Sequence, residues 1–110
     1  MYEKEKIVKK TLELGFSRVV VGMWRSLGWN LSTNELAKFV CDAADLGVTT
    51  FDHADVYGRG GVEELFGQAL ASSPGLRSRI QIVGKAGIRL TGMPGDVGTK
   101  EPIRIFVCEA

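Results

Sequence analysis

The sequence lacks the features of a membrane or secreted protein. Its longest apolar run lies around residues 19–21, far short of the ~20 apolar residues that a membrane-spanning helix needs. Residues 1–6 are mostly charged, so no apolar leader is visible. The two cysteines, Cys41 and Cys108, show no paired spacing and are interpreted as free thiols of a reducing compartment. We therefore expect a cytoplasmic protein that makes no membrane contact.

A charge excess and a metal-ligand pattern are also lacking. Lys and Arg total 14 against 13 for Asp and Glu, which leaves a net charge of +1 and no basic surplus for a nucleic-acid partner. His53 is the only histidine, and Cys41, His53 and Cys108 have no ligand spacing, so no metal site is predicted. Glycine, in contrast, is abundant, with 14 in 110 residues.

Strand-like and helical patterns alternate along the chain. Three consecutive valines at 19–21 are typical of a strand that is buried on both faces of a parallel sheet. Ser32 and Glu35 form a capping-box pattern, and Gly47 predicts the end of the helix that follows. The predicted elements are a strand at 18–23, a helix at 33–46, a strand at 48–51, a helix at 62–70 and a strand at 80–83.

This order predicts an α/β fold with a parallel sheet and right-handed crossovers. A small doubly wound sheet and a (β/α)8 TIM barrel both fit. A barrel needs ~250 residues, so in that case the chain is the N-terminal part, about three βα units. The ends are less regular: residues 6–16 are interpreted as two short strands, residues 91–100 as a loop, and residues 101–110 as a possible short strand.

Three polar side chains are predicted to gather where the strands end. Asp52 closes the second strand, Lys85 closes the third, and Tyr57 lies on the loop after Asp52. Because neighbouring strands lie ~4.8 Å apart, Asp52 and Lys85 can form an ion pair on one rim. An ammonium beside a phenol favours proton exchange near neutral pH. A structural ion pair beside a surface tyrosine is the alternative.

Three segments resemble the aldo-keto reductase family, in the order and spacing of that family. They are residues 20–25 (VVGMWR), residues 47–70 (GVTTFDHADVYGRGGVEELFGQAL) and residues 82–85 (IVGK). The resemblance extends over about residues 7–100, and the Asp-His-Ala-Asp form at residues 52–55 is closest to a bacterial oxidoreductase subgroup. It implies a TIM barrel that reduces a small aldehyde or ketone to an alcohol with NADP(H).

The resemblance also implies roles for individual residues. Tyr57 is the general acid, Lys85 lowers its pKa and Asp52 pairs with Lys85. Trp24 is a wall of the substrate pocket.

The cofactor-binding residues that the resemblance implies are Gly22, Met23 and Asp52, near the nicotinamide.

The tail departs from the family. Residues 101–110 (EPIRIFVCEA) do not resemble the helix and histidine-bearing strand that continue the family pattern, and His53 is in the wrong place for that histidine. We therefore interpret residues 1–110 as an incomplete domain, truncated or frameshifted near Lys100 and inactive alone. One alternative is a non-catalytic remnant that binds a partner or dimerises. Another is a small α/β ligand-binding domain whose sheet edge is completed by the tail.

For several residues, a structural role is an alternative to a functional one. His53 is expected to be packed rather than to tune a pocket. Residues 58–61 (GRGG) are expected to be a turn rather than a phosphate cradle. Trp29 is expected to pack in the core or in a loop, Cys41 to be buried, and Asp55 to be solvated.

Overall fold

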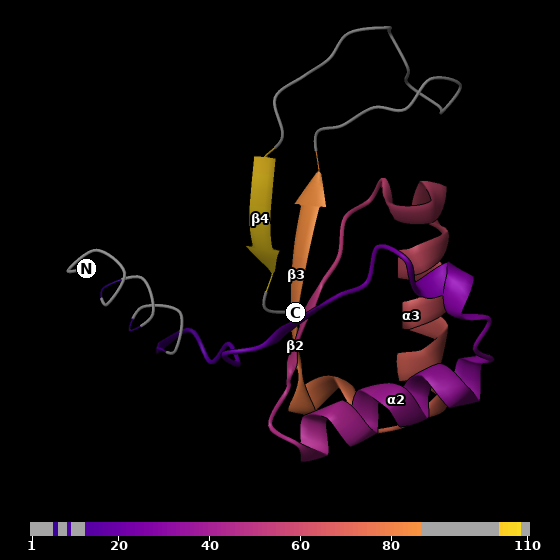
Figure 1. Cartoon of the computed structure of the whole chain (residues 1–110), viewed down its shortest axis with the longest axis horizontal. Helices are drawn as coiled ribbons and strands as arrows, with labels where there is room; N and C mark the ends of the chain where they lie inside the picture. Colours follow the sequence, from indigo (N-terminus) through magenta and orange to yellow (C-terminus); the bar gives the residue numbers. More distant parts are fainter. Residues whose placement is uncertain (1–5, 7–8, 10–12, 87–103, 109–110) are drawn as a thin grey trace, which may run out of the picture.

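A computed structural model describes residues 6, 9, 13–86 and 104–108. Its sheet has the strand order β1 (Val20–Gly22), β2 (Thr50–Asp52), β3 (Gln81–Ala86) and β4 (Arg104–Cys108). Figure 1 labels β2, β3 and β4. The first three strands are parallel, whereas β4 pairs with β3 in the antiparallel direction. The α/β prediction and its parallel strands are therefore confirmed.

Two helices connect the parallel strands. They are α2 (Thr33–Asp45), between β1 and β2, and α3 (Gly61–Ser72), between β2 and β3. Short 3-10 helices lie in the loops: η1 (Ser26–Trp29), η2 (Tyr57–Gly60) and η3 (Arg77–Arg79). None of the helices in the described part of the chain is long and apolar enough to cross a membrane.

The capping box predicted for α2 is present. The Ser32 hydroxyl accepts from the Glu35 N–H at 3.1 Å, and the Glu35 carboxylate accepts from the Ser32 N–H at 3.0 Å. Two helix-end N–H groups that would otherwise need water are thereby satisfied. Gly47 follows the helix with φ +86, the left-handed conformation expected of a glycine at this position.

The hydrophobic core lies between the two helices and one face of the sheet. Phe51, in the centre of β2, is fully buried and its ring lies 5.6 Å from that of Phe66 on α3. Met23, together with Leu36 and Val40 of α2, is also fully buried in this cluster. Phe39, which shares the helical spacing of Leu36 and Val40, is 37% exposed, so the apolar stripe of α2 is buried only in part.

The opposite face of the sheet is open. Val20, which shares this face with Asp52, is 45% exposed, whereas Val21 packs against the core. The prediction that residues 18–23 are buried on both faces is therefore wrong. Successive side chains of a strand point to opposite faces, and the two described helices cover only one of them.

The predictions for the two ends of the chain had different outcomes. Lys6, Lys9 and Glu13 are helical, so the prediction of two short strands over residues 6–16 is wrong at these positions. The short strand predicted within residues 101–110 is confirmed as β4, and it completes the sheet beside β3. Because all strands of a TIM barrel are parallel, the antiparallel β4 does not take the place of a fourth barrel strand.

The capping box generates a prediction about stability. We expect Ser32→Ala to lower the free energy of unfolding by about 1 kcal/mol, because the Glu35 N–H loses the hydroxyl that accepts its hydrogen bond. Urea titration followed by circular dichroism measures the change. Asn34→Ala, at an exposed position of the same turn, is the control and should cause no loss. Equal effects of the two substitutions would contradict the role of the box.

Candidate functional site

The carboxyl ends of β2 and β3 bring Asp52 and Lys85 together. The strand register places Asp52 beside Gly22 on one side and Val83 on the other, and Lys85 lies two residues further along β3, on the same face. The Lys85 ammonium donates to Asp52 Oδ1 at 2.5 Å. The ion pair that the strand ends predict is therefore present, on the open face of the sheet.

Backbone hydrogen bonds also join the loop after β2 to β3. The N–H of His53 donates to the carbonyl of Val83 at 2.7 Å, and the N–H of Asp55 donates to the carbonyl of Lys85 at 3.1 Å. Asp55 itself is exposed, as predicted. The first residues of the loop are thus fixed to β3, which limits where Tyr57 can lie.

Lys85 is surrounded by groups that favour its charge. Its side chain is 18% exposed, and its Nζ lies 5.0 Å from the centroid of the Tyr57 ring. Partial burial is the largest single effect and acts to lower the pKa of Lys85. The hydrogen bond and charge of Asp52, with the interaction with Tyr57, outweigh burial and raise that pKa above its ordinary value. The lysine is therefore a fixed cation at the rim.

A glycine turn positions Tyr57. Gly58, Arg59 and Gly60 have φ values of 58°, 54° and 90°, all in the left-handed region. A Cβ at Gly58 would collide with Cδ1 of Leu27, whose side chain lies against the turn. The segment 58–61 is therefore a tight turn that packs against Leu27 at Gly58 and Gly61. Leu27 was not predicted, because nothing in the local sequence marks it as a neighbour of this turn.

The remaining residues singled out in the sequence differ in how far their side chains are exposed. Trp24 is 61% exposed, and the centroid of its ring lies 6.4 Å from that of Tyr57. The Arg25 guanidinium lies 5.1 Å from the centroid of the Trp24 ring. Met23 is fully buried, so only its backbone can meet a ligand. Trp29 packs against Phe39 with centroids 5.4 Å apart, which matches its predicted packing role.

These residues fit the nicotinamide end of a dinucleotide only in part. Gly22 lies beside Asp52 in the sheet, and no atom lies within 4 Å of the position a Cβ would take there. A flat ring can approach the backbone closely at such a glycine. Gly22 therefore leaves room for such a ring, whereas the buried side chain of Met23 does not reach it.

His53 points away from this rim and into the protein. It is 2% exposed, its ring lies edge-on to Phe66 with centroids 4.3 Å apart, and both ring nitrogens lack a hydrogen-bond partner. Burial lowers the pKa of His53 from about 6.5 to about 4. The charge of Lys85 adds to this shift and that of Asp52 opposes it. The expectation of a packed histidine is confirmed. Cys41 is only half-buried, and its sulfur accepts from Arg79 at 3.2 Å.

Comparison with a family model and with known proteins finds related oxidoreductases in each case. The model of the Aldo/keto reductase family matches residues 18–107. Oxidoreductase YdhF of Escherichia coli (strain K12) is 49% identical over 82 residues, which cover 74% of this chain and 28% of YdhF. The uncharacterized oxidoreductase YcsN of Bacillus subtilis (strain 168) is 54% identical over 78 residues, which cover 71% of this chain and 26% of YcsN.

A solved structure is also similar. The chain matches a glycerol dehydrogenase of Gluconobacter oxydans with a TM-score of 0.53 and 30% identity, over 84% of this chain and 27% of the dehydrogenase. The chain therefore spans about a quarter of the length of the proteins it matches.

The burial of His53 generates a prediction about pH. NMR of its ring protons should give a pKa near 4, and the folded state should lose about 3 kcal/mol of stability as the pH falls from about 6.5 to below 4. The sign follows because the unfolded histidine binds a proton first on acidification. His53→Leu should remove this part of the pH dependence. A pKa near 6.5 in the folded chain would contradict the burial of the ring.

Proposed function

The chain belongs to the aldo/keto reductase family, and on that premise we propose that Asp52, Tyr57 and Lys85 form its proton-transfer site. The proposed reaction is the NADP(H)-dependent reduction of a small aldehyde or ketone to an alcohol. Its relatives are oxidoreductases, which supports the class of reaction. NADP(H) and the roles of the three residues rest on the family resemblance and on the chemistry of the site.

One observation carries the proposal: a charged lysine joins a carboxylate and a phenol at one rim. Lys85 Nζ lies 2.5 Å from Asp52 Oδ1 and 5.0 Å from the centroid of the Tyr57 ring. A surface ion pair between two exposed chains would leave the lysine free to move. Here partial burial and the short contact with Asp52 keep the ammonium beside the tyrosine. The alternative is a structural ion pair beside a surface tyrosine; the half-burial of Tyr57 and its contact with the ammonium favour the proposal over it.

The chemistry requires a proton and a hydride. When bound, the nicotinamide supplies the hydride that adds to the carbonyl carbon. Tyr57 Oη donates its proton to the carbonyl oxygen, and the Lys85 ammonium stabilises the phenolate that remains. Asp52 holds Lys85 charged and oriented. Trp24, whose exposed ring lies beside Tyr57, limits the space for the carbonyl substrate.

We further propose that these 110 residues alone do not catalyse the reaction. The face that carries Lys85 and Asp52 is open, and Val19, Val20 and Trp24 are exposed on or beside it. Water therefore reaches the rim, which weakens each electrostatic interaction that the proton transfer depends on. The residues proposed for the nicotinamide end, Gly22 and Asp52, also leave the rest of a dinucleotide without an assigned site.

A chimera tests the roles of these residues. Residues 18–86 of this chain replace the matching segment of the Gluconobacter oxydans glycerol dehydrogenase, and glycerol oxidation is measured with each nicotinamide cofactor. We expect an active chimera, and Tyr57→Phe should lower kcat ~100-fold or more with little change in KM, because the proton acceptor for the alcohol is lost. Lys85→Met should have an effect of similar size.

Trp29→Phe is the matched control, because Trp29 packs against α2 and should leave kcat within a factor of about two. An active chimera that tolerates Tyr57→Phe would overturn the proposed role of Tyr57. Reduction of aldehydes by the purified 110-residue chain alone would overturn the proposal that this chain is inactive by itself.

A further inference from the structure

The loop after β1 is a well-anchored segment that carries Trp24. The Met23 N–H donates to the Asp52 carbonyl at 3.0 Å, which ties the start of the loop to the end of β2. The Ser26 N–H donates back to the Met23 carbonyl, also at 3.0 Å, and Ser26 is 1% exposed. Leu27 comes next, within η1. Trp24 and Leu27 therefore belong to one unit, which is fixed to the sheet and to the interior.

The turn after Tyr57 is a second unit, and its conformation needs support. Gly58, Arg59 and Gly60 have left-handed φ values in succession. A residue with a side chain, such as Arg59, rarely adopts this conformation, and it persists where neighbouring groups hold it in place. Within the unit, the Tyr57 N–H donates to the Ala54 carbonyl at 3.2 Å. Groups that contact the turn therefore decide where Tyr57 lies.

The Leu27 side chain separates the two units. A Cβ at Gly58 would collide with Leu27 Cδ1, and a Cβ at Gly61 would lie 3.1 Å from the same atom. Glycine at both positions is therefore what gives the leucine its place between the loop and the turn. Leu27 is 42% exposed, so it contributes little to the core. Its contact with the turn is the main interaction that its methyl groups make.

The two aromatic rings do not fix this spacing by themselves. The centroids of Trp24 and Tyr57 lie 6.4 Å apart, near the far end of the range for interacting rings, and Trp24 is 61% exposed. The Lys85 ammonium lies 5.0 Å from the centroid of the Tyr57 ring. A shift of the turn relative to the loop would therefore move the tyrosine with respect to both groups.

We propose that Leu27 is a positioning residue: its methyl groups hold the Tyr57 turn apart from the Trp24 loop and so set the width of the space in which a substrate carbonyl meets Tyr57. The effect on the substrate rests on the proposed function, whereas the separation of the two rings does not. Without these methyl groups the turn moves toward the loop, because a vacated space is partly filled by its surroundings. The narrower space then admits an unbranched carbonyl compound better than a branched one.

Nuclear Overhauser effects between the Trp24 and Tyr57 rings measure the separation in the 110-residue chain, because the effect falls steeply with distance. We expect Leu27→Ala to bring the rings closer and to strengthen the cross-peak ~2-fold or more. Gly61→Ala adds a methyl group on the other side of the same contact and should weaken the cross-peak. Gly61 has a φ of −67°, which alanine adopts without strain. In the double variant, the new methyl group should restore the separation that Leu27→Ala loses.

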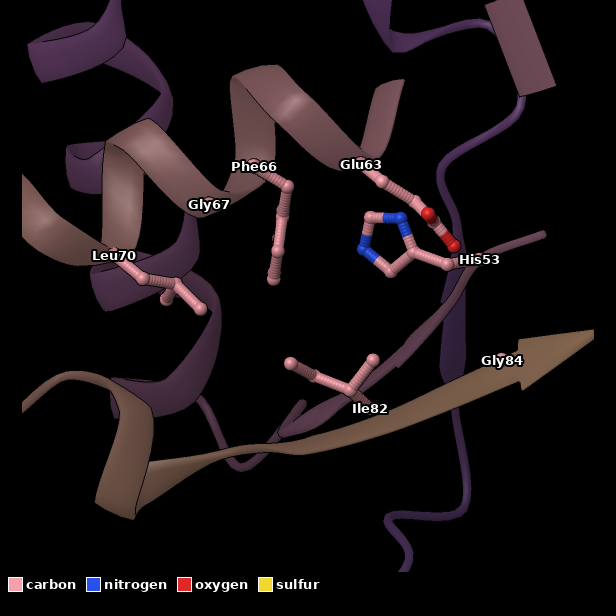
Figure 2. A pocket seen from close by; sticks show the side chains of 7 residues that line it. All are labelled: His53, Glu63, Phe66, Gly67, Leu70, Ile82 and Gly84. Atoms are coloured by element: carbon pink, nitrogen blue, oxygen red, sulfur yellow. The ribbon is translucent and has the colours of Figure 1, made fainter. Parts of the chain in front are cut away.

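Gly67→Ala is the matched control, because it makes the same substitution further along α3. Gly67 lines the pocket beside His53 (Figure 2), and no atom of the described residues lies within 4 Å of its Cβ position. The cross-peak between the two rings should be unchanged. The contact between the Phe51 and Phe66 rings, followed in the same spectra, shows that each variant folds.

An unchanged cross-peak in folded Leu27→Ala would overturn the spacing role. Should that variant fail to fold, an unchanged cross-peak in Gly61→Ala would overturn it equally. A double variant that departs from the parent chain as far as Leu27→Ala does would also contradict the proposal, because the two residues would then not share one contact.

The chimera with the Gluconobacter oxydans dehydrogenase tests the effect on the substrate. Its kcat/KM is measured for propanal and for isobutyraldehyde, and Leu27→Ala should lower the value for isobutyraldehyde relative to propanal by ~10-fold. An unchanged ratio would overturn the effect on substrate size. If the chimera tolerates Tyr57→Phe while the cross-peaks follow the prediction, the proposed function fails and the spacing role of Leu27 stands.

Discussion

The ion pair between Lys85 and Asp52 joins the ends of two neighbouring parallel strands, and the geometry of the rim depends on it. The 2.5 Å contact fixes the lysine above the sheet, and backbone bonds from His53 and Asp55 to β3 fix the start of the loop that carries Tyr57. The turn after Tyr57 is then held by Leu27.

The two faces of the sheet have different roles: one packs against the helices in the core, and the other carries the candidate site. Phe51 points toward the helices and is fully buried, whereas Asp52, the next residue, points to the open face. The alternation of side chains along one short strand therefore assigns adjacent residues to the core and to the site. His53 returns to the helical side, which explains why the only histidine of the chain takes no part in the rim. The open face is the side of the sheet that the described helices leave uncovered.

Much of this arrangement could be predicted from the sequence, because it depends on local signals. The capping box at Ser32, the valine run and the position of Asp52 and Lys85 at strand ends are each visible in a few neighbouring residues. What could not be predicted depends on contacts between distant segments. The contact of Leu27 with Gly58 joins two loops, and the exposure of Val20 depends on which elements cover the sheet. Residues 6–16 mix lysines with aliphatic residues at a spacing that fits both helix and strand.

The central claim is that Asp52 and Lys85 act as one unit at the rim, and the protonation of Lys85 tests it most directly. Its pKa can be followed by NMR of the Nζ and Cε nuclei in the 110-residue chain and in Asp52→Asn. The account predicts a pKa above the ordinary lysine value in the unchanged chain and a lower one in the variant, where burial acts without the opposing carboxylate. The same pKa in both chains would contradict the account.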